Sequence, residues 1–347
     1  MSSINVVIPC YNAGRFLAQC IHSVLSQNID DLRIVVIDNA STDDSVEVAR
    51  RLAAEDSRVE VVCHARNLGP VVSYNEGVDI ARGDYFMLLC ADDLLTEGSL
   101  RRAVEVLDSN PRAVFTIGPK LDMIDGENFV EPSQPDGWRV TEGVQFIEDC
   151  CRHLGNSIAL GSVLVRMPAQ KAVGHYRASL PHANDLEMAL RLAQLGQVVE
   201  FEGALGINRL HAAQITAVYF SDKLTQLKQR LAVFDSFFSR EGAAMPEANR
   251  LHRIAIHKVA DVAYWQAILN LFRGKTAFGV ELLRYCFSLT PASRLFPPLG
   301  HFYRSKGAFK RALLVISGRS LGGHYPGDGR GDEIRGKHDV AFTRTHQ

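Results

Sequence analysis

The chain has 347 residues, of which 46% are hydrophobic. It can therefore bury a full core, which excludes a disordered or fibrous protein. The formal net charge is −1, yet the charges are unevenly spread: residues 250–320 contain 12 Lys and Arg against 2 acidic residues, whereas residues 1–249 contain 22 against 33. A basic segment attached to an acidic body indicates an anionic surface or ligand at that segment.

The seven cysteines follow neither CxxC nor disulfide-framework spacing, and several lie in apolar patterns. We expect them to be reduced core residues of a cytosolic protein. The first predicted strand begins at Ile4 with no signal peptide before it. No uninterrupted apolar run reaches the roughly 18 residues that a membrane-spanning helix needs, so any membrane contact is expected to be peripheral.

The first third of the chain alternates short apolar runs with helical patterns. The predicted helices cover 16–25, a segment from an N-cap at Ser41 to about Asp56, and a segment that ends near Arg82. This alternation predicts an α/β fold, with a doubly wound, mostly parallel sheet flanked by helices. The predicted strands are 4–9, 33–38, 59–63, an apolar run from 83 that ends at the Asp92-Asp93 pair, and 113–117.

The regular alternation of predicted strands and helices ends after Pro119. Residues 120–140 are rich in Asp, Gly and Pro and are predicted to be a surface loop. A helix (141–154), a strand (157–165) and a helix that begins beside Asp185 and stops at Gly196 are expected next, followed by helices from residue 221. We predict three parts: an α/β domain (1–220), a basic helical region (221–320) and a disordered tail (321–347).

Two predicted strands end in carboxylates. Asp38 ends the second strand, and Asp92 and Asp93 end the fourth. Ligands of parallel sheets bind at the carboxyl ends of the strands, and paired hard oxygen donors suit a divalent cation that holds phosphate oxygens. The alternative is that one of the two acids caps the helix expected near Thr96 or Glu97.

Several motifs together carry a resemblance. They are Val7-Ile8-Pro9-Cys10-Tyr11-Asn12, Asp38-Asn39-Ala40-Ser41-Thr42-Asp43, Arg66-Asn67-Leu68-Gly69, Ala91-Asp92-Asp93, Gly174-His175-Tyr176, Asn184-Asp185 with Arg191, and Arg209-Leu210-His211. Their order and spacing over residues 3–220 resemble the family 2 glycosyltransferases, whose catalytic domain has the GT-A fold. The resemblance implies an inverting enzyme that uses a nucleotide-diphosphate sugar.

The resemblance implies a nucleotide-sugar site at the first strand ends. Pro9, Tyr11 and Asn12 would lie at the base, with the Tyr11 ring against it, unless Tyr11 packs on the following helix. Asp38 and Asn39 would read the base edge, although the commoner pattern is Asp-Asp-Gly and Asn39 could instead make a structural turn. In the next loop, Arg66 and Asn67 would lie beside the diphosphate.

The resemblance also implies a metal site. Asp92 and Asp93 would be the metal and ribose ligands for Mg²⁺ or Mn²⁺, with His211 as a metal or phosphate contact and Arg209 nearby. An acid is usual two places before the pair, where this chain has Cys90, so the metal is expected to rest on the pair alone or to bind weakly. His211 could equally be a surface histidine.

Asp185 matches the general base of the inverting members. In this role it would accept the proton of the acceptor hydroxyl, and its place at a helix N-terminus would keep it ionised. A simple N-cap is the alternative. Asn184 stands where the family often has Glu.

The processive members' Gln-x-x-Arg-Trp signature is absent from the sequence, which favours transfer of one sugar at a time. We expect a donor of the UDP or dTDP type. The acceptor would be a glycan or lipid-linked hydroxyl of cell-surface polysaccharide assembly. Aromatic residues interleave with the basic charges of residues 250–320, which could contact an anionic membrane at the inner face of a cell or pack as a helical bundle.

Other functions fit the sequence less well. A nucleotidyltransferase would need a glycine-rich loop with a basic end after the first strand, and a dehydrogenase would need Gly-x-Gly-x-x-Gly there. No nucleic-acid-binding motif accompanies the basic charge, so nucleic acid is not an expected partner. The remaining alternative is a catalytically inactive protein that binds a nucleotide sugar.

Overall fold

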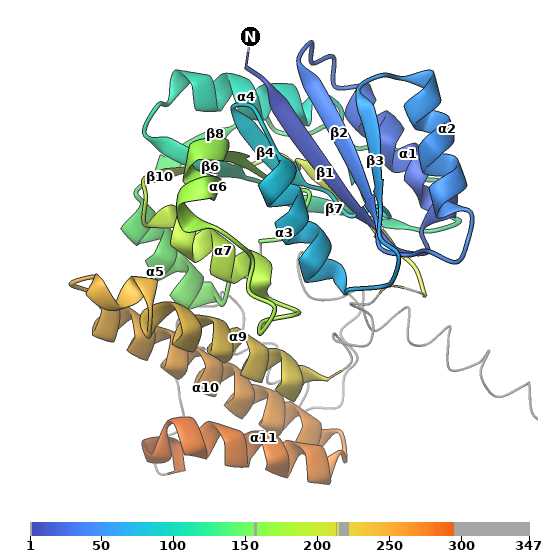
Figure 1. The fold of residues 1–347 in the computed structure, drawn as a ribbon. Coiled ribbons are helices and arrows are strands. Elements are labelled where there is room, and N and C mark those ends of the chain that lie inside the picture. The colour runs from blue at the N-terminus through green and yellow to red at the C-terminus, as the bar shows by residue number, and fades with distance from the viewer. Residues whose placement is uncertain (1, 156–157, 213, 215–221, 295–347) are drawn as a thin grey trace, which may run out of the picture. The chain divides into compact units, whose positions relative to one another are not determined.

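The computed structural model describes residues 2–155, 158–212, 214 and 222–294 (Figure 1). Two compact units are distinguished, and each is considered by itself: residues 1–263 with 288–290, and, of the described residues, 264–287 with 291–294. The predicted boundary at 220 and the predicted tail at 321–347 lie outside the described residues, so the three-part division stays a prediction.

Four parallel strands form one half of the large sheet, as the sequence predicts. They are β1 (Ile4–Cys10), β2 (Leu32–Asp38), β3 (Val59–Cys63) and β4 (Tyr85–Leu88), arranged in the order β3-β2-β1-β4. β1 pairs along its length with β2, so that Cys10 lies opposite Asp38. The buried apolar side chains of these strands account for the runs seen in the sequence.

The other half of the sheet has mixed directions and continues in the order β9-β6-β10-β8. β9 (Val163–Arg166) runs antiparallel between β4 and β6 (Ala113–Ile117). β10 (Gln197–Phe201) pairs parallel with β6, and β8 (Trp138–Thr141) is antiparallel at the edge. The strand predicted for 157–165 is therefore shorter and later, and its first residue is not described.

A second sheet of three strands corrects the prediction of a loop at 120–140. β7 (Lys120–Ile124) lies in this segment and pairs parallel with β11 (Gly206–Leu210), which also pairs with β5 (Leu94–Leu95). The prediction failed because the pairing partners are more than 80 residues away along the chain, while the local composition resembles a loop. In this small sheet, β5, which directly follows the acid pair, is paired with β11, which contains Arg209.

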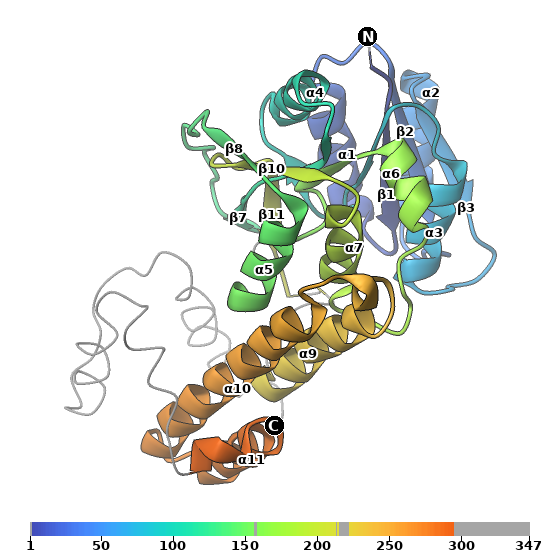
Figure 2. The ribbon, with the colours of Figure 1, turned by 90° about the vertical axis from the view of Figure 1, so that its left-hand side faces the viewer.

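Helices cover both faces of the large sheet (Figures 1 and 2). α1 (Gly14–Leu25), α2 (Ser45–Glu55) and α4 (Ser99–Ser109) share one apolar core with β1 and β2. α3 (Pro70–Ile80) packs on the opposite face, where a Cβ atom at Gly77 would meet Val7. α2 begins later than predicted, because the Ser41 hydroxyl accepts a hydrogen bond from the Asn12 amide instead of capping the helix.

The remaining helices are α5 (Gly143–His153), α6 (Met167–Val173), α7 (Asn184–Ala193), α9 (Lys223–Phe238), α10 (Ala248–Phe272) and α11 (Thr276–Leu289), with short 3-10 turns η1 (Glu241–Ala244) and η2 (Pro291–Arg294). Of these helices, α6 was not predicted from the sequence, whereas the others lie in segments that were predicted to be helical. All seven cysteines are thiols and not disulfides, and five of them are buried, as expected of reduced core residues. Within residues 2–155, 158–212 and 222–294, no helix combines the length and hydropathy that a membrane span requires.

Candidate active site

The ends of β1 and β2 form the first wall of the candidate site. Asp38 is buried at the end of β2, where its Oδ2 accepts a hydrogen bond from the Ser41 amide at 3.0 Å. Its Oδ1 is buried and has no hydrogen-bond partner among the described residues. The Asn12 Oδ1 accepts from the Thr42 amide at 2.8 Å, and the Tyr11 ring is 47% exposed. A buried carboxylate oxygen without a partner can accept a hydrogen bond from a donor that reaches it.

Asn39 uses its whole side-chain amide to shape the neighbouring loop. Its Oδ1 accepts from the Leu68 amide at 2.8 Å and lies 3.0 Å from His64 Nδ1, while its Nδ2 donates to Asn67 Oδ1 at 2.9 Å. The Asn39 side chain is thus engaged in holding the loop in this structure. The predicted contact with a base edge therefore needs a rearrangement, whereas Arg66 on the same loop is exposed.

The turn after β4 presents Asp92 to the end of β11. Asp92 Oδ2 lies 3.0 Å from His211 Nε2, and the His211 ring packs 4.7 Å from the ring of Phe16. The His211 side chain is only 7% exposed, and its Nδ1 has no partner in the described part of the chain. The structure therefore brings together two residues that are 119 positions apart in the sequence and that the resemblance paired as metal contacts.

Asp93 points into a different set of contacts. Its Oδ2 accepts from Lys120 Nζ at 2.5 Å and its Oδ1 accepts from the Arg209 amide at 3.1 Å. The Arg209 guanidinium in turn donates to the Asp92 carbonyl at 3.0 Å. Although burial by itself lowers the pKa of Lys120, the Asp93 carboxylate outweighs it and holds the pKa of the ammonium above its ordinary value. Lys120 and Asp93 therefore form a buried ion pair.

The chemistry of these donors fits a divalent cation. One potential ligand atom from each of Cys90, Asp92 and Asp93 lies within 4.8 Å of the others. Burial, and then the charges of Asp93 and Asp92, raise the pKa of the Cys90 thiol well above its ordinary value. A soft sulfur is also a poor ligand for a hard cation such as Mg²⁺. The fitting donors are the Asp92 carboxylate and the His211 imidazole.

Asp185 lies in the first turn of α7, as predicted. Its Oδ1 accepts from the Leu186 amide at 2.7 Å. Burial raises the pKa of Asp185, and the positive charge of Arg230 together with the helix N-terminal amides opposes that rise. The expectation that the helix end alone would fix its ionisation was incomplete, because burial is the larger influence. A carboxyl group with a raised pKa suits proton transfer better than an ordinary one.

The charges of Asp92 and Asp185 act on a common neighbour, Tyr74 of α3. Burial raises the pKa of Tyr74 most, and neighbouring acidic groups, among them Asp185 and Asp92, raise it further. Tyr74 also packs edge-on against Tyr176, with ring centroids 5.8 Å apart. The acid pair and Asp185 therefore share one electrostatic neighbourhood.

The contacts that Arg191 makes are structural. Its guanidinium forms an ion pair with Glu187 at 2.9 Å, and both side chains are almost fully buried. It also donates to the carbonyl groups of Val173 and His175. This part of the resemblance therefore lies in the packing of α7 on the 173–177 segment.

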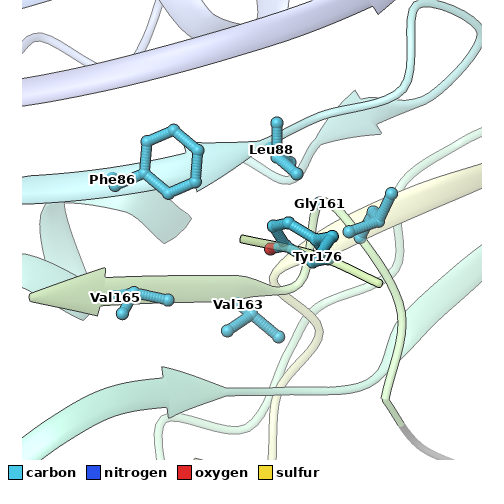
Figure 3. Close-up of a pocket in the computed structure, with 7 residues that line it drawn as sticks. Phe86, Leu88, Gly161, Val163, Val165 and Tyr176 are labelled. Carbon is cyan, nitrogen blue, oxygen red and sulfur yellow. The ribbon is translucent and has the colours of Figure 1, made fainter. Parts of the chain in front are cut away.

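Two hollows differ greatly in size. The one in Figure 3 lies among Phe86 and Leu88 of β4, Val163 and Val165 of β9, and Tyr176; its volume of about 10 Å³ makes it a packing void. A hollow of about 750 Å³ lies between α1, the loop after β7 and β11. That volume lies within the range of small-molecule sites, which is about 300–1,000 Å³. Arg209 is common to this hollow and to the acid pair.

The sequence analysis missed Lys120, Tyr74 and Arg230. A usable signal existed for Lys120, because a charged residue follows an apolar strand there as it does at Asp38 and Asp92. Tyr74 and Arg230 lie within helical patterns and carry no local signal. Their proximity to Asp185 arises only from the packing of α3 and α9.

Comparison with known proteins points to a family. Residues 5–161 match the family described as Glycosyl transferase family 2. This segment, just under half of the chain, is of the family 2 glycosyltransferase type. A curated relative, an uncharacterized glycosyltransferase of Haemophilus influenzae, is 25% identical over 222 residues, which cover 62% of this chain and 68% of the relative. Several further relatives are matched over less than half of their own length.

Two solved structures bear out the GT-A fold of this chain. The mannosyltransferase PcManGT from Pyrobaculum calidifontis, in complex with GDP-Man and Mn²⁺, aligns with a TM-score of 0.57 at 16% identity and covers 90% of this chain and 81% of its own. Residues 1–349 of S. aureus TarS, in complex with UDP-GlcNAc, align with a TM-score of 0.52 at 13% identity; the alignment covers 84% of this chain and 92% of the TarS chain. Both likenesses concern the fold.

Proposed function

We propose that this protein transfers one sugar, with inversion, from a nucleotide-diphosphate sugar to a hydroxyl group of a glycan or lipid-linked acceptor. The observation that carries the proposal is the 3.0 Å approach of His211 to Asp92 at the strand ends, in the electrostatic neighbourhood of Asp185. The complexes of the structural neighbours with GDP-Man and UDP-GlcNAc support a donor of this class.

The donor would be held at the ends of β1, β2 and β4. Tyr11 would lie against the base, next to Pro9 and Asn12, and the partnerless Asp38 Oδ1 would accept from the base edge. Asp92 and His211 would hold Mg²⁺ or Mn²⁺, which neutralises charge on the diphosphate when bound. Arg66 and Asn67 would flank the diphosphate from the loop that Asn39 shapes.

Asp185 would act as the general base. In the transfer, the acceptor oxygen forms a bond to the anomeric carbon while the bond from that carbon to the diphosphate oxygen breaks. The hydroxyl proton passes to the Asp185 carboxylate, and the electron pair of the broken bond leaves with the nucleoside diphosphate. Attack opposite to the leaving group inverts the anomeric centre.

The alternatives are a catalytically inactive sugar-nucleotide-binding protein and a sugar-phosphate nucleotidyltransferase. The former would keep donor binding without a base, whereas Asp185 lies buried in the first turn of α7 with a raised pKa, as suits a general base. The role in surface polysaccharide assembly at the inner membrane face belongs to the same proposal, as does membrane contact through residues 250–320.

The Asp185→Asn variant tests the proposal. We expect sugar transfer and donor hydrolysis to fall by about 10² to 10⁴-fold, the usual contribution of general base catalysis, while nucleoside diphosphate binding measured by calorimetry is retained. Asp136→Asn, whose side chain is 91% exposed, is the matched control and should keep full activity. An unchanged transfer rate in Asp185→Asn would refute the role of this residue as base.

A further inference from the structure

Both carboxylate oxygens of Asp93 are occupied by this chain itself. Lys120 Nζ donates to Oδ2 and the Arg209 amide donates to Oδ1, and the Asp93 side chain is only 5% exposed. Asp92, the adjacent acid, is 26% exposed and meets the His211 ring. The two neighbouring carboxylates of this turn therefore have different partners and different exposure.

The position of Lys120 is fixed on a second side. Its Nζ also donates to the Leu160 carbonyl at 3.0 Å, and only 12% of its side chain is exposed. Gly161, at a φ of +77°, lets the turn approach closely, since a Cβ there would lie 2.8 Å from a Leu89 methyl and 3.9 Å from Lys120 Nζ. The ammonium is therefore a built-in part of the acid site, not a surface charge that happens to reach it.

The charge balance follows from these contacts. Lys120 pairs with one of the two carboxylates, and a cysteine, Cys90, stands two places before Asp92. The ion pair with Lys120 occupies Asp93 and leaves Asp92 beside the His211 imidazole.

We infer that Lys120 is a positioning residue that holds Asp93 away from the cation, so that Asp92 and His211 are the side chains that bind the divalent metal. The inference rests on the proposed function, because it concerns the metal of that same site. It assigns Asp93 to linking β7 to β11 and not to metal coordination. Removing the ammonium would then release a second carboxylate ligand and tighten metal binding.

Titration with Mn²⁺ alone, followed by calorimetry, tests this assignment. We expect Asp92→Asn to weaken Mn²⁺ binding by at least about tenfold and Asp93→Asn to change it by less than about threefold. Lys120→Met should strengthen Mn²⁺ binding by about three- to tenfold, because Asp93 becomes available. Lys171→Met, which removes the same charge from α6, should leave Mn²⁺ binding unchanged.

Thermal melts in EDTA report on the ion pair without any metal. Lys120→Met and Asp93→Asn each leave a buried charge unpaired, and each should lower the melting temperature by about 5 to 10 °C. The double variant Asp93→Asn/Lys120→Met should recover most of that loss. If Lys120→Met does not fold, this double variant carries the test, and its Mn²⁺ affinity should match that of the parent within about threefold.

Two results would overturn the inference. They are an equal loss of Mn²⁺ binding in Asp93→Asn and Asp92→Asn, and a Lys120→Met affinity no higher than that of Lys171→Met. Failure of the proposed function is distinguishable: a parent protein that binds no Mn²⁺ would refute the metal site and this inference together, whereas one that transfers no sugar from any nucleotide sugar would refute the activity while leaving the metal comparison intact.

Discussion

Asp185 should give the enzyme a pH dependence that Arg230 controls. A general base works only when ionised, so kcat/KM falls as the pH drops through its pKa. Because burial raises the pKa of Asp185 above its ordinary 3.8, this acid limb should lie at a higher pH than for an exposed aspartate. Arg230→Met removes the opposing positive charge, which raises the pKa further and should move the limb to still higher pH.

The pH profile of kcat/KM measures this shift. Arg240→Met is the matched control, because Arg240 is exposed beyond the end of α9 and its loss should leave the limb in place. A limb that stays fixed, or moves to lower pH, in Arg230→Met would contradict the electrostatic account of Asp185.

Single residues were predictable where a chemical group stands at the end of an apolar strand. Asp38, Asp92 and Asp185 all carry that kind of local signal, either at a strand end or at a helix start. The pairing of Lys120 with Asp93 was not predictable, since it depends on a ladder between β7 and β11 that joins distant segments. Asn39 shows the reverse, because its family position suggested a base contact while its amide is engaged by the adjacent loop.

At the scale of elements, α7 depends on a buried cluster of charges. Glu187 is fully buried and pairs with both Arg191 and Arg177. Glu187→Gln leaves the buried Arg191 guanidinium without a carboxylate and Arg177 with Glu241 alone, so the free energy of unfolding should fall by about 3 kcal/mol. Because α7 carries Asp185, transfer activity should become more heat-sensitive as well.

Thermal or denaturant unfolding checks the Glu187 prediction. Glu47→Gln on the exposed side of α2 should change the free energy of unfolding by no more than about 0.5 kcal/mol. If Glu187→Gln and Glu47→Gln had the same free energy of unfolding, the Glu187 cluster would contribute no more to stability than a surface acid does.

Strands could be predicted from the sequence where both faces of the strand are buried. β1, β2 and β4 are largely apolar and buried, so their positions follow from local sequence. β7 and β8 are half-exposed and lie among Asp, Gly and Pro residues, so their strand character arises only from pairing with β11 and β10. β9 is inserted antiparallel between β4 and β6, an order that no run of residues specifies.

On the scale of the whole molecule, the excess positive charge lies in residues 250–320. Much of that segment, from residue 295, lies outside the described residues, so the predicted membrane contact stays a prediction. Vesicle co-sedimentation with anionic and zwitterionic lipids tests it. We expect binding to the anionic vesicles alone, with a loss on raising salt, because each basic residue near such a surface contributes on the order of 1 kcal/mol.

Donor choice also belongs to the whole molecule, because the base would meet Tyr11 and Asp38 from two loops. Stacking on Tyr11 tolerates any base, so the partnerless Asp38 Oδ1 is the group that discriminates, and as an acceptor it favours a base edge that presents an N–H. Uracil and thymine offer such a group at N3, and guanine offers N1–H and an amino group, so GDP has to be compared with UDP and dTDP. UDP or dTDP with Mn²⁺ should therefore stabilise the protein by about 2.7 kcal/mol at 100 times the dissociation constant.

A thermal melt with UDP, dTDP and GDP, each with and without Mn²⁺, separates the two contributions to donor binding. Asp38→Asn should weaken UDP binding by about 1–3 kcal/mol, the cost of a mispaired buried group, and should leave the gain from Mn²⁺ intact. Asp92→Asn should instead abolish the gain from Mn²⁺ and keep the preference among bases. If Asp38→Asn bound all three nucleotides as the parent does, the Asp38 carboxylate would not read the base, and selection would have to come from the loop that Asn39 holds.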